Sequence, residues 1–494
     1  MDNRFNVRDP AHYENRELSW LAFNRRVLAQ AQNDRTPLLE RIKFVAIWSS
    51  NMDEFFQVRV AGFKDQVARG RSTRTPDGLT PSAALAQIRA EVDKQAKRAV
   101  KVYHQLLEEL AVEQIEILSW SDLDKSDAKY LRQLFEERIF PVITPLAVDP
   151  GHPFPYISNL SLSIGIVLRD PADGNRRFAR LKVPDVLGRF IRLPKGDRFV
   201  PIEDIVVANA GQLFPGMEIS ETIGFRVTRN ADLDIDEDEA SNLLSAIELE
   251  LRRRRFQRPV RLELSHALSP DTADLLVDEL ELEPQDLYVS DIPLDLSNLM
   301  QLAGLDRPEL RDRDHVPVTP RVFRSEDDEP ADVFALLRKR DVLVHHPYDS
   351  FVTTVLEVLA QACADPAVQA IKMTLYRTSG DSPVVDYLIR AAEAGKQVAV
   401  VVELKARFDE AANIEWARRL EDAGVHVAYG LVGLKVHTKT MLIVRAEADG
   451  IRRYSHVGTG NYNPGTARLY TDFGLLTANE VIGDDLARLF NGLT

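Results

Sequence analysis

The regular alternation of strand-like and helix-like runs in the last part of the chain is the feature that most constrains its fold. The strand-like runs cover residues 370–377, 396–406, 425–430, 439–445, 454–460 and 473–478, and the helix-like runs cover 382–395 and 413–424. A strand, a helix and a further strand in this order form a parallel pair through a right-handed crossover. The pattern therefore predicts an α/β domain built on a parallel sheet.

Cationic residues stand where two of these predicted strands end. Arg377 closes the first strand, and Lys405 and Arg407 close the next. Ligands of parallel α/β sheets bind at the carboxyl ends of the strands. Neighbouring strand ends are therefore expected to bring the three cations together, which suits an anionic ligand.

The length of 494 residues corresponds to roughly three domains. Helical spacing of apolar residues predicts an N-terminal helical bundle, interrupted by a polar loop at 70–82. Short β-rich runs such as 198–207, together with a long helix at 237–254, predict an α+β middle domain, and a Pro- and charge-rich stretch at 307–330 predicts a connection between domains. The predicted domains are a helical domain at 1–112, an α+β domain at 113–320 and an α/β domain at 321–494.

Composition excludes several classes of protein. Cys363 is the only cysteine, which excludes structural disulfides and thiolate-rich metal sites. The net charge of −14 argues against non-specific binding of nucleic acid, so no nucleic-acid partner is predicted. No stretch approaches the length of about 18 apolar residues that a transmembrane helix needs. Residues 1–20 lack the apolar segment of a signal peptide, so we expect a cytoplasmic protein.

The segment KVHTK is the sharpest candidate for chemistry. If residues 435–443 are extended, the period of two places Lys435, His437 and Lys439 on one face. A neutral imidazole can attack phosphorus directly, and flanking ammonium groups stabilise the charge on the non-bridging oxygens. We therefore expect His437 and Lys439 to be catalytic, with Lys435 in a supporting role.

The glycine-rich turn GTGN at 458–461 follows this segment. Its backbone N–H groups and the amide of Asn461 suit a phosphoryl group at close quarters. A His-x-Lys tripeptide by itself is most often an ordinary surface or core pair, and its position beside the turn favours a site. His456 precedes the turn, where it either assists proton movement or orients His437, or is a packed strand histidine.

Two further clusters have a structural interpretation. Arg252 to Arg255 close a predicted helix, where cations complement the helix dipole, so a structural role is favoured over binding of an anionic ligand. His345 and His346 precede the sequence Pro-Tyr-Asp. Without cysteines or a paired carboxylate motif they are predicted to be turn residues rather than metal ligands.

Long runs of the chain strongly resemble the bacterial polyphosphate kinase 1 family, a branch of the phospholipase D superfamily. The matching runs include SNMDEFFQVR, FPVITPLAVDPGHPFPYISNLSLSI, FRVTRNADLDIDEDEA, RRFQRPVRLEL, VLVHHPYDSF, IKMTLYRTSGDSPVVDYL, VAVVVELKARFDEA, VGLKVHTKTMLIV and HVGTGNYNPGTARLYTDFGLLTA. The resemblance implies a phospholipase D-like fold for the last domain. It also implies reversible transfer of the terminal phosphoryl group of ATP to inorganic polyphosphate, with Mg²⁺ and a phosphohistidine intermediate.

The resemblance also implies roles for individual residues. His437 matches the phosphorylated histidine of the family, and Arg377 and Arg407 match a pair associated with magnesium. A guanidinium has no lone pair to give a cation, so these arginines are expected to grip the phosphate oxygens that the metal also bridges. Lys405 is a candidate for a further phosphate-binding cation.

Two positions match the nucleotide contacts of the family, and each has an alternative. Asn51 begins the sequence Asn-x-x-Glu, a capping box, so it is a helix cap or a ligand, and the two roles can coexist. Tyr470 is a nucleotide contact or a half-buried strand aromatic.

The chain departs from the family pattern in two ways. Val444 stands where the phospholipase D pattern has Asp; polyphosphate kinases lack that Asp too, so the kinase is favoured over a phosphodiesterase. The family also has a second phospholipase D-like domain, for which this sequence shows no counterpart, so we expect a fragment. Such a chain is expected to bind nucleotide weakly, to make little polyphosphate and to expose an apolar patch near its end.

Three functions remain open on the sequence alone. The favoured one is an ATP:polyphosphate phosphotransferase, with ATP or ADP and inorganic polyphosphate as its small-molecule partners. The alternatives are a phospholipase D-type phosphodiesterase and a non-catalytic polyphosphate- or nucleotide-binding protein. The resemblance further suggests a homo-oligomer with a loose, peripheral association with membranes.

Overall fold

The structure, a computed structural model, divides into two compact units. It describes residues 6–148, 152–172, 174–231, 243–254, 256–324, 330–376, 382–404, 409–430 and 434–494. The N-terminal unit comprises Met1–Asp232 and Arg254–Arg313, and the C-terminal unit comprises Leu233–Arg253 and Asp314–Thr494. The boundary after Arg313 falls inside the predicted connection at 307–330. The limits of the three predicted domains stay a prediction.

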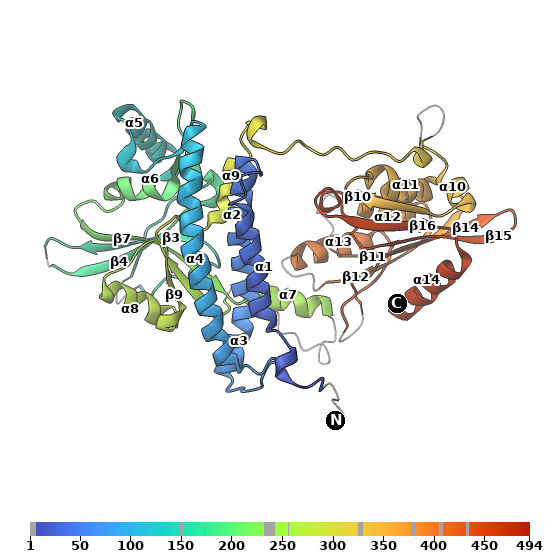
Figure 1. The fold of residues 1–494 in the computed structure, drawn as a ribbon, viewed down its shortest axis with the longest axis horizontal. Helices are drawn as coiled ribbons and strands as arrows, with labels where there is room; N and C mark the ends of the chain where they lie inside the picture. Colours follow the sequence, from blue (N-terminus) through green and yellow to red (C-terminus); the bar gives the residue numbers. More distant parts are fainter. Residues whose placement is uncertain are drawn as a thin grey trace, which may run out of the picture. The chain divides into compact units, whose positions relative to one another are not determined.

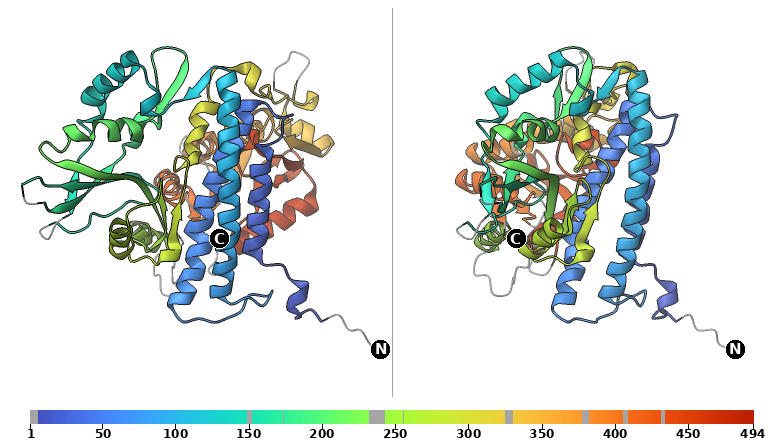
Figure 2. Two further views of the ribbon diagram at one scale, coloured as in Figure 1. Left: turned by 60° about the vertical axis from the view of Figure 1, so that its left-hand side comes forward. Right: turned by 90° about the vertical axis from the view of Figure 1, so that its left-hand side faces the viewer.

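The predicted N-terminal helical bundle is confirmed. It consists of α1 (Arg16–Gln30), α2 (Leu38–Phe55), α3 (Ala61–Ala68) and α4 (Pro81–Val112), and α4 runs beside α1 and α2 (Figure 2). The Asn15 side chain caps α1 by accepting two backbone N–H bonds, and Thr80 caps α4. Buried side chains between the helices include Leu21, Leu28, Ile42, Val45, Ile88 and Val92. The predicted polar loop at 70–82 joins α3 to α4, although its last two residues already belong to α4.

The α+β region that follows is also confirmed. A six-stranded sheet has the order β2-β4-β3-β7-β8-β9, and a three-stranded sheet has the order β1-β6-β5. The larger sheet contains β2 (Leu146–Val148), β3 (Leu162–Arg169), β4 (Arg176–Lys182), β7 (Glu218–Arg229), β8 (Pro259–Leu264) and β9 (Leu287–Val289). The smaller sheet contains β1 (Ile115–Ile117), β5 (Phe190–Arg192) and β6 (Asp197–Pro201), and the main helices of this region are α5 (Lys125–Leu134), α6 (Ile202–Asn209) and α8 (Pro270–Glu279).

One β-rich run of this region was predicted wrongly in part. The run at 198–207 starts as β6 but continues as α6 from Ile202. Glu203 and Asp204 lie in the first turn of α6, where carboxylates complement the helix dipole. Ile202, Ile205 and Val206, which suggested a strand, are buried in a core of the N-terminal unit from a helix instead, whereas Val207 is exposed.

The helix predicted at 237–254 belongs to the C-terminal unit, although it stands between β7 and β8 in the sequence. It is described as α7 (Leu243–Arg254), and its earlier part lies outside the described residues. Leu244 and Ile247 are buried in the main core of the C-terminal unit. Its position therefore follows from its apolar face rather than from its neighbours in the sequence.

The sheet of the C-terminal unit is mixed, not parallel throughout (Figure 1). Its order is β10-β16-β15-β14-β11-β12-β13. The strands are β10 (Val342–His346), β11 (Val368–Leu375), β12 (Gln397–Val402), β13 (His426–Ala428), β14 (Lys439–Glu447), β15 (Gly450–Gly458) and β16 (Asp472–Thr477). The strands β11, β12 and β13, which α12 (Pro383–Glu393) and α13 (Glu410–Asp422) connect, are parallel as predicted. The prediction is wrong for β14, β15 and β16, because β14 pairs antiparallel with both β11 and β15, and β15 pairs antiparallel with β16. The link from Glu447 to Gly450 is too short for the crossover that a parallel pair of β14 and β15 would need.

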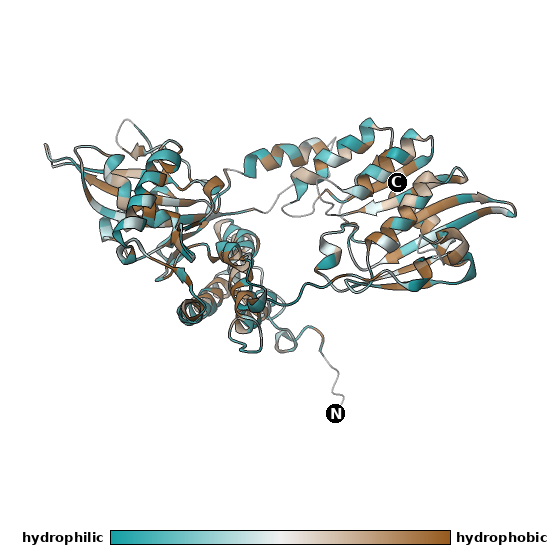
Figure 3. Cartoon of the chain, turned by 90° about the horizontal axis from the view of Figure 1, so that it is seen from above, coloured by the Kyte–Doolittle hydropathy of each residue, from teal (hydrophilic) through white to brown (hydrophobic). Residues whose placement is uncertain are grey.

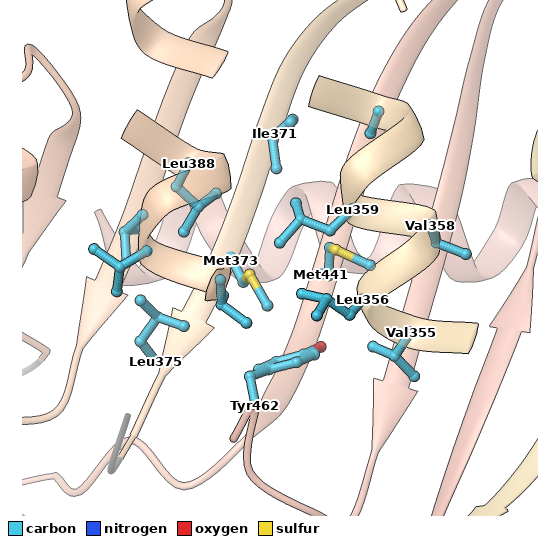
Figure 4. Packing of buried hydrophobic residues seen from close by; sticks show 14 of the residues in the cluster. Val355, Leu356, Val358, Leu359, Ile371, Met373, Leu375, Leu388, Met441 and Tyr462 are labelled. Carbon is cyan, nitrogen blue, oxygen red and sulfur yellow. The ribbon is translucent and has the colours of Figure 1, made fainter. Parts of the chain in front are cut away.

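Helices cover both faces of this sheet. On one face α10 (Val333–Lys339), α11 (Glu357–Ala364), α12 and α13 enclose the main core, where Leu359, Met373 and Met441 pack together (Figure 4). On the other face α14 (Glu480–Leu493) packs Leu486 and Phe490 on the sheet. The fold class, helical, α+β and α/β in order, is confirmed.

An apolar strip stays exposed on the sheet face beyond α14. Leu343, Val457 and Phe473 are 65%, 38% and 48% exposed, and strand pairing places them on one face of β10, β15 and β16. This agrees with the apolar patch expected near the end of the chain. Figure 3 shows the helices striped in polar and apolar residues, as amphipathic helices are. None of the helices in the described ranges has both the length and the apolarity to cross a bilayer.

Candidate active site

The segment with the candidate nucleophile lies just before β14, between the ends of β11 and β12. β14 begins at Lys439, so the extended structure predicted from residue 435 starts later than expected. The Thr374 hydroxyl of β11 donates to the Thr438 carbonyl at 2.8 Å and accepts the Thr440 N–H at 3.0 Å. The Glu403 carboxylate, just past β12, accepts the Val436 N–H at 2.7 Å. Buried side chains of two neighbouring strands thus determine the path of this segment.

The side chains of Lys435, His437 and Lys439 meet around one aromatic ring. The Lys435 and Lys439 Nζ atoms each lie 5.3 Å from the centroid of the Tyr376 ring. The His437 ring lies 5.4 Å from it, centroid to centroid, at an angle of 75°. The structure therefore brings the three residues together as the spacing predicts, although Tyr376 does so rather than a regular strand.

The two lysines differ in burial. Lys439 is buried and its Nζ donates to the His437 carbonyl at 2.6 Å, whereas Lys435 and His437 are exposed. Burial lowers the pKa of Lys439 and the Lys435 ammonium adds to this, while Asp472 opposes it. A phosphate at this position would offset the cost of burying that cation, since its charge is opposite.

The glycine turn is tied to the start of β16. The Thr459 hydroxyl donates to Asp472 at 2.7 Å, and the Thr459 N–H donates to the Phe473 carbonyl at 2.9 Å. A Cβ at Gly460 would lie 2.6 Å from Asp472 Oδ2, so only glycine allows this approach. The Thr459 N–H is thus bonded within the protein, and the expectation that backbone N–H groups of the turn bind a phosphoryl group stays a prediction. The Asn461 Oδ1 is buried and has no hydrogen-bond partner among the residues that the structure describes, so its supporting role stays a prediction.

His456 is a packed strand histidine. It lies in β15 and is 3% exposed, and its Nδ1 is 2.7 Å from the Tyr462 hydroxyl. A Cβ at Gly474 would lie 2.5 Å from its Nε2, so the strand beside it leaves no room for a larger residue. Burial lowers the pKa of His456 to about 3, with a smaller contribution from His346.

We expect His456 to stay neutral down to about pH 4 and its burial to make the fold acid-sensitive. Because its folded pKa is depressed, the unfolded chain takes up a proton below the ordinary pKa of about 6.5 while the folded chain does not. Stability should therefore fall as pH drops from about 6.5 toward 3. NMR titration of ring-labelled histidines checks this, with His456→Gln assigning the signal. A His456 signal that titrates near pH 6.5 would contradict it.

The paired histidines are not turn residues as predicted, because they are the last two residues of β10 and pair with Phe473 and Asp472 of β16. The His346 Nδ1 donates to the Asp349 carbonyl at 2.8 Å, and the His345 ring stacks on Phe473 at 4.3 Å. In the part of the chain that the structure describes, no group of three or more His, Cys, Asp or Glu side chains is arranged to hold a metal ion. The structural interpretation of the arginine cluster agrees with the structure, because Arg253 pairs with Glu250 at 2.8 Å near the end of α7; Arg255 lies outside the described residues.

Asn51 and Tyr470, the two candidate nucleotide contacts, do not have the structural roles that the sequence offered as alternatives. Asn51 is in the last turns of α2, which begins at Leu38, so it is not a helix cap. Its Nδ2 donates at 2.9 Å to the Oδ1 of Asn24, whose own Nδ2 donates at 3.2 Å to the Trp48 carbonyl. Tyr470 is 63% exposed in the loop before β16, so it is not a half-buried strand aromatic. Asn51 belongs to the N-terminal unit and Tyr470 to the C-terminal unit.

The three cations predicted at the strand ends lie outside the described residues. Arg377 directly follows Tyr376, and Lys405 and Arg407 follow Leu404. β11 and β12 pair in parallel with Leu375 opposite Val402, so the strands that lead to these cations are neighbours. Their meeting at one site stays a prediction.

Sequence reasoning missed the residues that hold the candidate nucleophile in place. Thr374, Tyr376 and Glu403 were not singled out, although all three are polar or aromatic residues at the ends of predicted strands. A search of strand ends for any polar side chain, not only for cations, would have found them.

Comparison with known proteins covers the chain from its first helix to its end. Family profiles match residues 13–118 (polyphosphate kinase N-terminal domain), 126–302 (polyphosphate kinase middle domain) and 332–494 (polyphosphate kinase C-terminal domain 1). A protein from Mycobacterium marinum named polyphosphate kinase is 54% identical over 493 residues, which is 98% of this chain and 67% of that protein. A polyphosphate kinase from Streptomyces coelicolor is 54% identical over 97% of this chain and 64% of its own length.

A solved structure has the same fold over nearly the whole chain. The crystal structure of polyphosphate kinase from Porphyromonas gingivalis matches with a TM-score of 0.81 and 30% identity, over 97% of this chain and 68% of that chain. The chain thus spans about two thirds of the length of these relatives.

Proposed function

The chain belongs to the polyphosphate kinase family, and we propose on that basis that it transfers the terminal phosphoryl group of ATP to inorganic polyphosphate through His437. The observation that supports this most is the meeting of Lys435, His437 and Lys439 around Tyr376. It offers an exposed imidazole beside a ring that two ammonium groups also approach, an arrangement that suits phosphoryl transfer. A phosphodiesterase is not favoured, because the curated relatives are named polyphosphate kinase.

The phosphoryl transfer proceeds in two steps. In the first, a lone pair of the neutral His437 imidazole attacks the γ-phosphorus, an N–P bond forms, and ADP leaves with the electrons of the broken P–O bond. In the second, a terminal oxygen of polyphosphate attacks the same phosphorus and the N–P bond breaks, which regenerates the imidazole. The ammonium groups of Lys435 and Lys439 stabilise the charge on the non-bridging oxygens in both steps.

The proposal extends to the metal and the remaining site residues. Mg²⁺ is usually held in such sites by phosphate oxygens of the substrate and a few protein oxygens, and a guanidinium cannot ligate it. We therefore propose that Mg²⁺ arrives on the phosphates of ATP, where it neutralises their charge. Arg377 and Arg407, with Lys405 as a candidate further cation, would then grip the phosphate oxygens that the metal also bridges. A homo-oligomeric state, a peripheral membrane association and a cytoplasmic location stay predictions.

Labelling with radioactive ATP tests the proposed function. Two proteins are compared: the 494-residue chain, and a chimera that adds the remaining third of the Mycobacterium marinum relative. We expect γ-labelled but not α-labelled ATP to give the chimera an acid-labile, base-stable phosphoprotein, and the chimera to lengthen polyphosphate chains. The 494-residue chain is expected to bind nucleotide but to make little polyphosphate. Cleavage of a chromogenic phosphodiester without nucleotide, in the absence of any label, would contradict the proposal.

The hydrogen bonds behind Asn51 predict which groups of ATP its side-chain oxygen can contact. The Trp48 carbonyl can only accept, so Asn24 must present its Nδ2 there and its Oδ1 to the Asn51 Nδ2. Asn51 thus keeps its Oδ1 as an acceptor. In ATP only the base amino group and the ribose hydroxyls can donate to it, since ionised phosphates only accept.

We expect Asn24→Leu to weaken ATP binding about as much as Asn51→Leu, because Asn51 then loses its orientation. The loss of one hydrogen bond corresponds to about a fivefold to tenfold weaker affinity. Isothermal titration of the two variants with ATP measures this. Gln133→Leu, which removes an exposed amide on α5, is the control and should bind like the unaltered chain. Unchanged affinity in Asn24→Leu would contradict the prediction.

A further inference from the structure

The ring of Tyr376 lies close to Lys435, His437 and Lys439, the three residues of the His437 segment. It directly follows β11 and is 9% exposed, so its ring is packed inside the protein rather than lying in solvent. The Lys435 Nζ, the Lys439 Nζ and the His437 ring all lie between 5.3 and 5.4 Å from its centroid. We propose that Tyr376 is a positioning residue that presents His437 between the two ammonium groups. This inference rests on the proposed role of His437.

The ring offsets a repulsion that the segment would otherwise suffer. Lys435 and Lys439 carry the same charge, so their ammonium groups repel each other. A negative or electron-rich group close to both offsets this repulsion. The face of an aromatic ring is electron-rich and attracts a cation within about 6 Å of its centroid, a limit that both ammonium groups meet. The His437 ring meets it at 75°, the edge-to-face arrangement that aromatic pairs prefer.

The strand that leads to Tyr376 makes it a rigid support. β11 lies inside the sheet, paired with β12 on one side and β14 on the other. Thr374 and Tyr376 are two residues apart, and Thr374 bonds the Thr438 carbonyl and the Thr440 N–H of the same segment. One strand end therefore holds the backbone of the His437 segment through Thr374 and its side chains through Tyr376.

This arrangement predicts an effect on the rate of transfer rather than on nucleotide affinity. A tyrosine ring has few rotatable bonds, so it can hold three mobile side chains at a small entropic cost. Without the ring the ammonium groups would move apart and the imidazole would lose its orientation toward the γ-phosphorus. A displacement of about 1 Å at a reacting group can lower a rate by about a hundredfold. The proposed nucleotide contacts of Asn51 and Tyr470 would be unchanged.

The test compares single-turnover labelling of the chimera by γ-labelled ATP in three variants. Tyr376→Phe keeps the ring, whereas Tyr376→Leu and Tyr376→Met remove it at similar bulk. We expect the maximal labelling rate of Tyr376→Phe to stay within about threefold of the unaltered protein and that of the other two to fall at least tenfold. The ATP concentration for half-maximal rate should change less than about threefold in all three. Tyr387→Leu, which removes a ring that also holds a cation, that of Arg390 on α12, is the matched control.

Each outcome bears on the inference. Wild-type-like labelling of both Tyr376→Leu and Tyr376→Met would overturn it, and so would a Tyr376→Phe protein as slow as those two, because the hydroxyl and not the ring would then matter. The inference would also be overturned if Tyr387→Leu lost the labelling rate tenfold as well and thermal unfolding showed that the Tyr376 and Tyr387 variants are destabilised alike. If the unaltered chimera takes no label on His437, the proposed function itself fails. If the unaltered chimera is labelled and the Tyr376 variants are labelled equally well, only the inference about Tyr376 fails.

Discussion

Replacing His437 with Gln is expected to abolish the phosphoprotein, with labelling by γ-labelled ATP reduced at least about a thousandfold. The reason is that glutamine keeps a polar side chain of similar size but has no nucleophilic lone pair on nitrogen. His437 is exposed, so the substitution should leave the thermal unfolding temperature nearly unchanged. Acid lability of the label, measured on the chimera and on its His437→Gln variant, gives the answer directly.

A matched histidine distinguishes loss of the nucleophile from loss of a histidine in general. His426 is exposed on β13 of the same sheet, so His426→Gln should be labelled like the unaltered protein. If His437→Gln were labelled equally well, the assignment of the nucleophile would be wrong. The search would then move to His345, His346 and His456 in the same unit.

The second large effect is expected in the stability of the N-terminal unit. Asp53 on α2 is 6% exposed and bonds Arg226 of β7 at 2.6 and 2.7 Å and Arg261 of β8 at 2.5 Å. Asp53→Ala leaves two buried guanidinium groups without their shared carboxylate, although Arg226 and Arg261 both keep Glu263. Removing one partner of a buried ion pair costs about 3 to 5 kcal/mol, which urea unfolding of the variant should show.

An exposed ion pair in the same unit provides the control. Arg89 and Asp93 pair on α4 at 3.0 Å with side chains 33% and 41% exposed, so Asp93→Ala should cost at most about 1 kcal/mol. Equal losses in Asp53→Ala and Asp93→Ala would contradict the expectation that burial sets the size of the effect.

The same carboxylate predicts a dependence on pH. Burial by itself would raise the pKa of Asp53, but the Arg226 and Arg261 guanidiniums outweigh it and hold the pKa below its ordinary value. A depressed folded pKa means that the unfolded chain binds the proton first as pH falls. The contribution of Asp53 is therefore complete above the ordinary aspartate pKa of about 3.9 and is lost as pH falls through the lower folded value. The Asp53→Ala variant should lack this part of the acid dependence.

Two features of the site could be predicted from spacing. Residues two apart in extended chain lie on one side, which predicted the grouping of Lys435, His437 and Lys439, although Tyr376 and not a regular strand brings them together. Helix-connected strands pair in parallel, which was enough to place β11 beside β12. Local spacing was misleading at Asn51, where it suggested a helix cap. A capping box has meaning only where a helix begins, and α2 begins at Leu38.

The sequence by itself determined the succession of a helical, an α+β and an α/β region, because periodicity and turn chemistry act over a few neighbouring residues. Only the tertiary structure decided how the His437 segment is held. Its supports, Thr374, Tyr376 and Glu403, come from strands distant in the sequence, and nothing local in the segment encodes them. The transfer of α7 to the C-terminal unit was decided in the same way. It depends on which apolar faces can be buried against one another, and that is a property of the whole packed chain.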